Sequence, residues 1–209
     1  MRRLDVEKTI AQFNAWAPTY DSGLWSPYFD HCRRTVMQAV NPYLRSNLRV
    51  LDAGCGTGNL ILDLWQLEPS AELVGIDMSD SMLEIACNKP GMQSARACFM
   101  QADASRMPFR DESFDIILCL NAFHHFHEPL GDITRVLKQG GLLVLVDNSA
   151  DGPLRRLWIR LLKAHFDEGE AAYHGKGQLV QLLERYGLNV VKQTRLLYFV
   201  LVTICRKEG

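Results

Sequence analysis

The sequence predicts an α/β fold built on a mostly parallel sheet of seven strands, with helices on both faces. Three observations predict it. Strand and helix patterns alternate from Arg49 to Val146, which is typical of βαβ units and a parallel sheet. Three glycines lie in a turn at Gly54–Gly58, between the first strand and the helix after it. Two strand patterns, 188–191 and 197–204, follow one another across a short polar turn, which fits an antiparallel hairpin at the sheet edge.

The predicted elements follow in this order along the chain. Periodic apolar positions predict helices over 4–16 and 27–44, ahead of the sheet. Near-continuous apolar runs predict five buried strands, centred on Leu51, Val74, Phe99, Ile117 and Val144. The remaining helices are expected to begin at Asn59, to follow an N-cap at Ser79 with Met82, Leu83 and Ala86 on the inner face, and to span 130–137, 153–166 and 178–186.

The chain has 209 residues, which is enough for one domain with its own core. Ligands of open α/β sheets bind beyond the carboxyl ends of the strands, so the segments outside the sheet are expected to cover the site. We expect a single domain with an N-terminal helical lid (1–46), a ligand-binding core (47–148), substrate-side helices (149–187) and an edge hairpin (188–209).

Charge and composition limit which binding partners and which cellular compartment we expect. The net charge is −1 and the sequence pI is about 6.6, which gives no electrostatic reason to expect nucleic acid as a partner. No apolar run approaches the roughly 20 residues that span a bilayer, and the N-terminus is charged. Six scattered cysteines are typical of thiols in a reducing compartment, without the spacing of a zinc site. We expect a cytoplasmic protein without stable membrane insertion and without a metal.

The glycine turn is the strongest functional signal. It reads Asp52-Ala53-Gly54-Cys55-Gly56-Thr57-Gly58. Glycine lets the backbone pass within contact distance of a ligand, and the helix that begins at Asn59 offers unpaired N–H groups and a partial positive charge. The third glycine comes one residue earlier than in the G-x-G-x-x-G dinucleotide fingerprint. Asp52 is expected either to touch the ligand or to hold the loop by accepting its N–H groups.

A second acidic strand end lies where a nucleoside ligand needs it. Asp77 follows the buried run Leu73–Ile76, roughly 20 residues beyond the glycines. Its carboxylate can accept both ribose hydroxyls, and the soft side chain of Met78 is suited to lie against an adenine face. The alternative is that Asp77 is a solvated turn residue, which the glycine turn at this spacing disfavours.

The glycine turn with its preceding Asp52 resembles motif I of the class I S-adenosylmethionine (SAM) dependent methyltransferases, which have a Rossmann-like fold. The chain further resembles the small-molecule methyltransferases related to quinone biosynthesis. The segments that carry this likeness are Gly75-Ile76-Asp77, Asp103-Ala104, Pro108-Phe109 with Ser113-Phe114-Asp115, Asn121-Ala122-Phe123-His124-His125 and Leu137-Lys138-Gln139-Gly140-Gly141. The resemblance covers about residues 11–187. It implies methyl transfer from SAM, S-adenosylhomocysteine (SAH) as product, a helical lid and a C-terminal antiparallel strand.

The resemblance also implies roles for individual residues. Asp103 would bind the adenine amino group beside the Ala104 N–H, unless it caps a helix. Tyr20, in the segment Phe13-x-x-x-Ala17-x-x-Tyr20-Asp21, would close over the methionine end of SAM, unless it only packs. Asn121 would face the sulfonium at the methyl-transfer point. The predicted cofactor-binding set is Tyr20, Asp52, Gly54, Cys55, Gly56, Asp77, Met78, Met82, Asp103, Ala104 and Asn121.

Histidines and a basic helix are weaker signals. His124, His125 and His127 follow the fourth strand, and His125 is the candidate for a general base, although such residues also bond backbone. Only Cys119 is near them in sequence as a further metal ligand, so we expect no metal. The basic amphipathic stretch 153–163 fits either peripheral contact with a membrane or acidic substrate, or a lid helix with a solvated face.

The expected activity is therefore methyl transfer from SAM to a small-molecule acceptor by direct displacement. Two other functions stay open: a non-catalytic SAM-binding regulatory protein and, against the glycine spacing, a nicotinamide-dependent oxidoreductase. The sequence leaves open the acceptor, its reacting atom, the need for a base and the oligomeric state. His165, Tyr173 and His174 are further substrate-side candidates.

Overall fold

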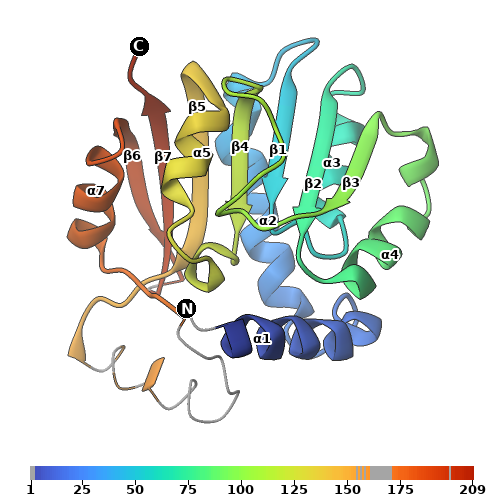
Figure 1. Ribbon diagram of the computed structural model, residues 1–209, viewed down its shortest axis with the longest axis horizontal. Helices are drawn as coiled ribbons and strands as arrows, with labels where there is room; N and C mark the ends of the chain where they lie inside the picture. The colour runs from blue at the N-terminus through green and yellow to red at the C-terminus, as the bar shows by residue number, and fades with distance from the viewer. Residues whose placement is uncertain (1–2, 154, 156, 158, 161–170, 198) are drawn as a thin grey trace.

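A computed structural model describes residues 3–153, 155, 157, 159–160, 171–197 and 199–209. The sheet has seven strands in the order β3-β2-β1-β4-β5-β7-β6 (Figure 1). The strands are β1 (Arg49–Ala53), β2 (Glu72–Asp77), β3 (Ala97–Gln101), β4 (Phe114–Leu120), β5 (Leu137–Asn148), β6 (Leu188–Leu196) and β7 (Val200–Lys207). Only β7 runs antiparallel to its neighbours, β5 and β6. The predicted mostly parallel sheet with an antiparallel C-terminal strand is confirmed.

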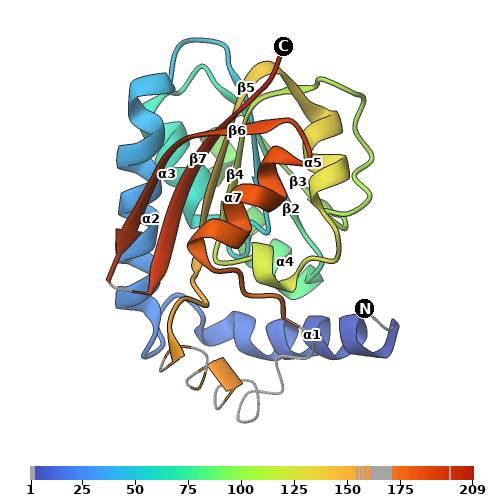
Figure 2. The same cartoon turned by 90° about the vertical axis from the view of Figure 1, so that its left-hand side faces the viewer.

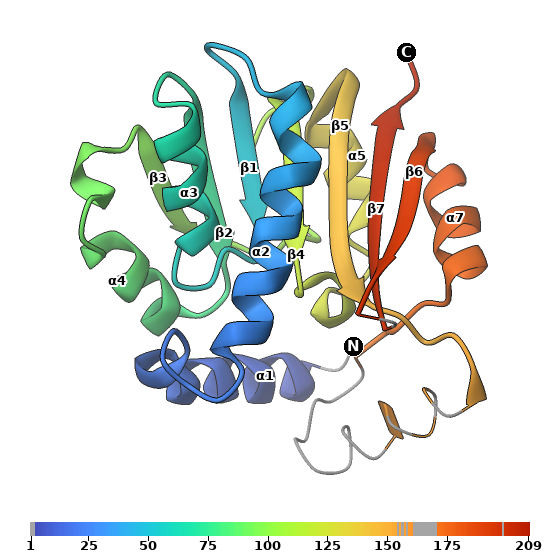
Figure 3. The ribbon, with the colours of Figure 1, turned by 180° about the vertical axis from the view of Figure 1, so that it is seen from behind.

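Helices cover both faces of this sheet. They are α1 (Arg3–Trp16), α2 (Ser26–Val40), α3 (Asn59–Leu67), α4 (Asp80–Asn88), α5 (Leu130–Val136) and α7 (Lys176–Glu184), with 3-10 turns η1 (Ala17–Thr19), η2 (Asn41–Tyr43), η3 (Met92–Ser94) and η4 (Phe123–His125). Figure 2 shows the sheet nearly edge-on between α2 and α3 on one side and α5 and α7 on the other. From behind, α2 crosses in front of the central strands (Figure 3).

Side-chain alternation along the strands explains the two layers. On β1, Leu51 and Ala53 pack toward α5 and α7, whereas Val50 packs toward α2 and α3. Each face therefore has its own apolar core, one with Ile133 of α5 and the other with Val36 of α2. The parallel strands are buried on both sides, which is why they appear in the sequence as continuous apolar runs.

Several element boundaries differ from the sequence-based expectation, and those of α2, β6 and β7 have a clear physical reason. The α-helix predicted over 27–44 ends at Val40, because Pro42 has no N–H to donate and the chain continues as η2. The predicted strand 188–191 extends to Leu196, and its partner begins at Val200 instead of 197. The polar residues 192–195 resembled a turn, but an edge strand with an exposed face accepts them. The turn comes later, where Leu197 has a φ of +48°.

The topology fixes where a ligand binds. The strand order reverses between β1 and β4, and ligands of open α/β sheets bind at such a switch point, outside the carboxyl ends of the strands. Helix α1 lies across this end of the sheet (Figure 1). Ser79 N-caps α4 as predicted, accepting a hydrogen bond from the Met82 N–H at 3.1 Å.

Part of the expected architecture stays a prediction. Most of the helix expected over 153–166 lies outside the described residues, as does His165. The division into lid, core, substrate-side helices and hairpin also stays a prediction. None of the helices in the described part of the chain combines the length and apolarity needed to cross a membrane.

Candidate active site

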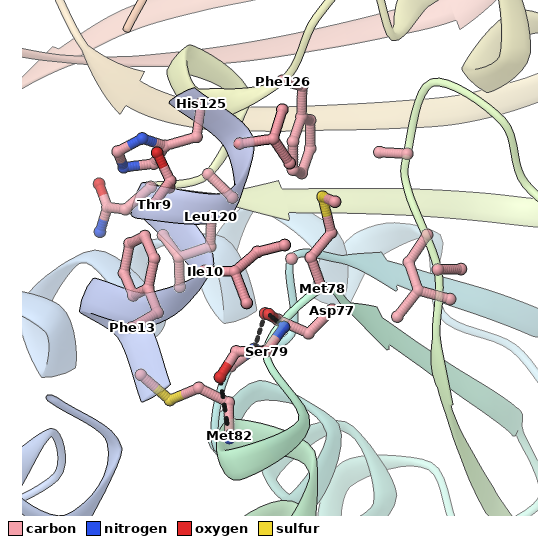
Figure 4. A pocket seen from close by; sticks show the side chains of 18 residues that line it. Thr9, Ile10, Phe13, Asp77, Met78, Ser79, Met82, Leu120, His125 and Phe126 are labelled. Carbon is pink, nitrogen blue, oxygen red and sulfur yellow. Dashed lines mark hydrogen bonds between the residues drawn. The ribbon is translucent and has the colours of Figure 1, made fainter. Parts of the chain in front are cut away.

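A first cavity lies at the switch point, between the strand ends and α1. Its walls come from α1, the glycine turn, the end of β2, the start of α4 and the loop after β4. Figure 4 shows Ile10 and Phe13 of α1 near Asp77 and Ser79. The open space measures about 80 Å³, below the roughly 300–1,000 Å³ that is usual for ligand pockets. A ligand of nucleoside size therefore requires α1 to shift.

The three glycines of the turn serve different purposes. The N–H groups of Gly54 and Cys55 both donate to the Ile76 carbonyl, at 2.8 and 2.9 Å, which ties the turn to β2. Gly54 has a φ of +80°, and a Cβ there would lie 2.4 Å from the Cβ of Ala122. Gly56 has a φ of +51°, and a Cβ there would meet nothing within 4 Å. Packing against the loop after β4 demands Gly54, whereas Gly56 leaves open space beside the cavity.

Asp77 lines the cavity and braces the turn. Its Oδ2 accepts a hydrogen bond from the Gly56 N–H and its Oδ1 accepts one from the Ser79 N–H, both at 2.9 Å. Burial raises the pKa of Asp77, and the backbone N–H groups of Ser79, Gly56 and Met78 oppose that rise. The carboxylate is thus held at the strand end where the sequence predicts a ribose partner.

We expect Asp77→Ala to weaken SAH binding by about 1.5–3 kcal/mol, or roughly 10- to 100-fold, because a charge-assisted bidentate contact is lost. Calorimetric titration measures this. Asp80→Ala is the matched control, since exposed Asp80 bonds only the neighbouring Ser81 N–H in the first turn of α4. Equal SAH affinities of the Asp77→Ala and Asp80→Ala variants would remove Asp77 from the site.

Asp52 is buried behind the turn. Its side chain is 2% exposed, and its Oδ1 has no hydrogen-bond partner among the described residues. Burial, followed by the charge of Asp77, raises the pKa of Asp52 to about 8. Among the described residues, no N–H group of the glycine loop donates a hydrogen bond to Asp52, and that expected role stays a prediction.

Asp21 holds the N-terminal segment onto the glycine turn. Its Oδ1 accepts hydrogen bonds from the Thr57 hydroxyl at 2.7 Å and the Asn59 amide at 2.8 Å. Its Oδ2 pairs with the Lys89 ammonium at 2.7 Å. Sequence reasoning named Asp21 only as part of a motif. We name these four residues, Asp21, Thr57, Asn59 and Lys89, the clasp.

Tyr20 lies next to the clasp, inside an aromatic cluster. Its ring stacks on Phe29 at 4.9 Å and meets Trp16 edge-on at 5.0 Å. Burial raises its pKa, and the nearby charges of Asp77 and other carboxylates add to the effect, so the hydroxyl stays protonated. Tyr20 does not line the cavity described above, and its contact with SAM stays a prediction.

We expect residues 11–25 to exchange amide hydrogen faster in the ligand-free protein and to gain protection with SAH, because the ligand requires α1 to shift and then to close. Tyr20→Phe should weaken SAH binding by about 0.5–1.5 kcal/mol for one lost hydrogen bond, and Tyr20→Ala by more. Hydrogen-exchange mass spectrometry and calorimetry measure these effects. If amide exchange did not change with SAH and Tyr20→Ala kept the wild-type SAH affinity, residues 11–25 would serve only to pack against the core.

The other predicted cofactor residues divide into two groups. Met78, Met82 and Ala104 line the first cavity. Cys55 and Asp103 do not line it: Cys55 is buried, with its Sγ close to Gly75, and Asp103 is exposed. Asp103 Oδ1 accepts a hydrogen bond from the Ser105 N–H at 2.8 Å in a turn, and none of the described helices begins there for Asp103 to cap. Their roles toward SAM stay predictions.

A second, larger cavity adjoins the first. It measures about 530 Å³, and most of its wall is aromatic, including Trp16, Trp25, Tyr28, Phe29 and Phe199. Phe13, Asn121 and His125 line both cavities. These three residues therefore mark the place where a ligand in one cavity meets a ligand in the other.

Asn121 stands at this boundary in a constrained conformation. Its φ is +53°, and its N–H donates to the Val146 carbonyl at 2.7 Å. Its Oδ1 accepts a hydrogen bond from the Tyr28 hydroxyl at 3.2 Å, whereas its buried Nδ2 has no nitrogen or oxygen partner among the described residues. Left-handed backbone at a residue other than glycine is characteristic of functional sites. The side chain of Asn121 is thus held at the boundary by Tyr28, and it also opposes the rise in pKa that burial causes at the Cys32 thiol.

His124, which directly precedes the sequence-based candidate His125, has a carboxylate partner. His124 Nδ1 lies 2.6 Å from Asp147 Oδ1, and the His124 N–H donates to Asp147 Oδ2 at 2.8 Å. His125 instead meets Phe13 edge-on at 5.2 Å, and its role as a base stays a prediction. Asp147 was missed in the sequence, although it is the acidic end of an apolar strand, the same signal that identified Asp77. Among the described residues, no group of three or more His, Cys, Asp or Glu side chains could hold a metal ion.

Comparison with known proteins agrees with this geometry. Residues 50–141 match the profile of a methyltransferase domain. In this segment the chain resembles methyltransferase domains. The chain is 39% identical over 139 residues to a demethylmenaquinone methyltransferase of Thermus thermophilus, covering 65% of this chain and 63% of that protein. A demethylmenaquinone methyltransferase of Deinococcus radiodurans is 37% identical over 112 residues, and the chain spans 46% of its length.

Solved structures share the fold of the methyltransferase domain. A putative methyltransferase in complex with the Haloferax volcanii activator Trm112 superposes with a TM-score of 0.80 at 19% identity, covering 94% of this chain and 98% of that one. The [4+2]-cyclase SpnF superposes with a TM-score of 0.72 at 18% identity, covering 90% and 83%. At such identities the likeness establishes the fold alone, and the second example shows that this fold also occurs in a cyclase.

Proposed function

We propose that this protein transfers a methyl group from SAM to a small aromatic acceptor. The observation that carries the proposal is the pair of cavities that meet at Phe13, Asn121 and His125. The first cavity offers Asp77 for a ribose and Gly56 for close approach of the ligand. These features fit SAM, which carries a ribose.

The chemistry asks little of the protein beyond alignment. When SAM is bound, its sulfonium supplies an activated methyl group. The chain's own part is to hold the acceptor in line at the boundary and to exclude water by closing α1 over both cavities. Phe13 of α1 lines both cavities, so one helix performs both closures.

The acceptor class follows from the second cavity. Its aromatic walls favour a ring that stacks against them, and Arg155 adds a cation beside the Phe199 ring. Two relatives are named demethylmenaquinone methyltransferases, which supports an acceptor with a hydroxylated aromatic ring. We propose a small-molecule acceptor and no nucleic acid, in line with the net charge of −1. The cytoplasm is the proposed compartment, because all six cysteines are free thiols.

Two measurements test this function. Calorimetry should show saturable SAH binding, and methyl-labelled SAM should yield labelled product with a panel of aromatic hydroxyl, amine and thiol compounds. Absence of SAH binding would overturn the cofactor assignment. Binding of SAH without label transfer to any acceptor would favour the non-catalytic alternative.

A further inference from the structure

His124 and Asp147 form a buried pair at the wall of the second cavity. His124 is 5% exposed and Asp147 is 7% exposed. Asp147 Oδ1 is 2.6 Å from His124 Nδ1 and also accepts the Asn148 N–H at 2.7 Å, while its Oδ2 accepts the His124 N–H at 2.8 Å. The carboxylate is therefore fixed by two backbone donors and oriented toward one ring nitrogen.

The imidazole ring is fixed as firmly as its partner. The Tyr173 ring stacks on it at 4.5 Å with an interplanar angle of 20°, and the His125 ring lies at 4.0 Å. The Ala172 N–H donates to the His124 carbonyl at 2.7 Å, which ties the segment around Tyr173 to the same loop. The ring consequently has one orientation relative to the cavity that it lines.

This geometry assigns the two ring nitrogens. A carboxylate at Nδ1 favours the tautomer that carries its proton on Nδ1, which leaves a lone pair on Nε2. Nε2 has no hydrogen-bond partner among the described residues. An imidazole ordered in this way by a carboxylate is the arrangement of a general base, in which the acid stabilises the imidazolium that forms.

Tyr28 is another titratable group in the wall of the second cavity, and it is unsuited to this task. Its hydroxyl donates to Asn121 Oδ1 at 3.2 Å, and burial, with the Cys32 thiol beside it, raises its pKa. It therefore stays protonated. The remaining titratable groups around the pair are His125, Tyr173, His174 and Arg155. Burial lowers the pKa of His174, which keeps it neutral.

We propose that His124 is the general base of the reaction and that the acceptor is an aromatic hydroxyl compound that must lose a proton. The proposal rests on the proposed function. Nε2 of His124 accepts the hydroxyl proton, and the acceptor oxygen, or the ring carbon that this oxygen activates, forms the new bond to the methyl carbon. The electron pair of the broken carbon–sulfur bond stays on sulfur. When the oxygen is methylated, the hydroxyl proton is the one that is lost. When the ring carbon is methylated, that carbon then loses its hydrogen as a proton and the oxygen regains one, so the acceptor again loses one proton in total. The imidazolium paired with Asp147 releases this proton to water.

Asn121 supports this step. It lines both cavities, and the Tyr28 hydroxyl donates to its Oδ1 at 3.2 Å. An acceptor at the boundary therefore contacts Asn121, whose amide is a polar group able to bond the acceptor oxygen. Asn121 is thus a binding group, and His124 is the group that takes the proton.

The first test reads the tautomer without SAM or acceptor. In protein labelled with nitrogen-15 at histidine, NMR should show the His124 proton on Nδ1 at neutral pH, and Asp147→Asn should remove that preference. A His124 with its proton on Nε2, or charged at neutral pH, would overturn the proposal, because Nε2 then has no lone pair to accept a proton. This readout is independent of whether SAH binds.

The second test reads proton transfer without methyl transfer. 4-Nitrophenol is the probe, because its phenolate absorbs visible light and its phenol form does not. With SAH present, the wild-type protein should raise the phenolate fraction of the bound probe, and His124→Gln should abolish that rise. His127→Gln, at an exposed position outside both cavities, is the matched control and should behave as wild type. No saturable binding of the probe, or an equal phenolate fraction in the His124→Gln variant, would refute the proposal.

Activity provides the third readout once an accepted phenol is known. His124→Gln should lower the rate of methyl transfer by about 10²–10⁴-fold, the usual contribution of a general base, with little change in SAH affinity. The loss should shrink as the pH approaches the value at which the acceptor ionises unaided. A uniform loss at every pH would assign His124 a structural role instead. Absence of SAH binding in the wild-type protein would count against the proposed function and leave the tautomer result standing.

Discussion

We expect Gly56→Val to abolish SAH binding. A Cβ at Gly56 meets no protein atom within 4 Å, and Gly56 lines the first cavity, so a branched side chain there occupies space that the ligand needs. We expect the affinity for SAH to fall by more than roughly 100-fold, because an overpacked contact of this kind costs about 1–3 kcal/mol and displaces the ligand as well. Calorimetric titration of the folded variant measures the loss.

The control separates backbone strain from ligand exclusion. Gly140 has a φ of +68° and open space around it, as Gly56 does, but it lies outside the two cavities that form the candidate site. Gly140→Val should lower the melting temperature in the same way and keep the SAH affinity of the wild type. A Gly56→Val variant that is folded and binds SAH normally would show that the turn is not the cofactor site.

Asp52→Asn should stabilise the ligand-free protein increasingly as the pH rises. The pKa of Asp52 is about 8 in the folded protein, against an ordinary value of 3.8. Between these values the unfolded chain has released the proton that the folded chain retains. The free energy of unfolding therefore falls with rising pH by up to about 1.4 kcal/mol per pH unit. The neutral amide removes this cost.

Denaturant unfolding from pH 4 to pH 8 checks the sign of this pH dependence, because the range runs from about the ordinary pKa of Asp52 to its pKa in the folded protein. Wild type and Asp52→Asn should be alike at the acid end and differ by a few kcal/mol at the basic end. Asp115→Asn is a control with the opposite expected pH dependence of stability. Although burial alone would raise the pKa of Asp115, the Arg49 N–H and Lys138 hold it below its usual range, so its stabilising effect is present above the unfolded pKa and disappears in acid. Parallel curves for wild type and Asp52→Asn would contradict the assignment.

The central strands of the sheet were predictable because β1, β2, β4 and β5 are buried on both faces. Val50, Leu73 and Ile117 lie in apolar runs that have no other explanation in a chain of this composition. The errors fell where local sequence and tertiary context disagree. Residues 192–195 are polar because β6 is an edge strand, and edge position is a property of the assembled sheet.

The site was predictable where one strand end carries the information. Asp77 and Gly56 are read from a short segment, and the structure places both at the first cavity. The proposed base was harder to predict, because the pairing of His124 with Asp147 joins the ends of two strands 23 residues apart. Two adjacent histidines are equivalent in a sequence, and only the turn η4 decides which of them faces the carboxylate. The clasp was hidden for the same reason, since Asp21 and Lys89 are distant in the chain.

Phe13 has a consequence for the order of events during turnover. Because this ring belongs to both cavities, a movement of α1 that admits one ligand also unseals the other. In the proposed reaction we therefore expect cofactor exchange and release of the methylated product to be coupled. We expect the clasp to stabilise the closed arrangement, so that neither ligand leaves the ternary complex alone. The position of Phe13 in the walls of both cavities thus couples the release of the two ligands.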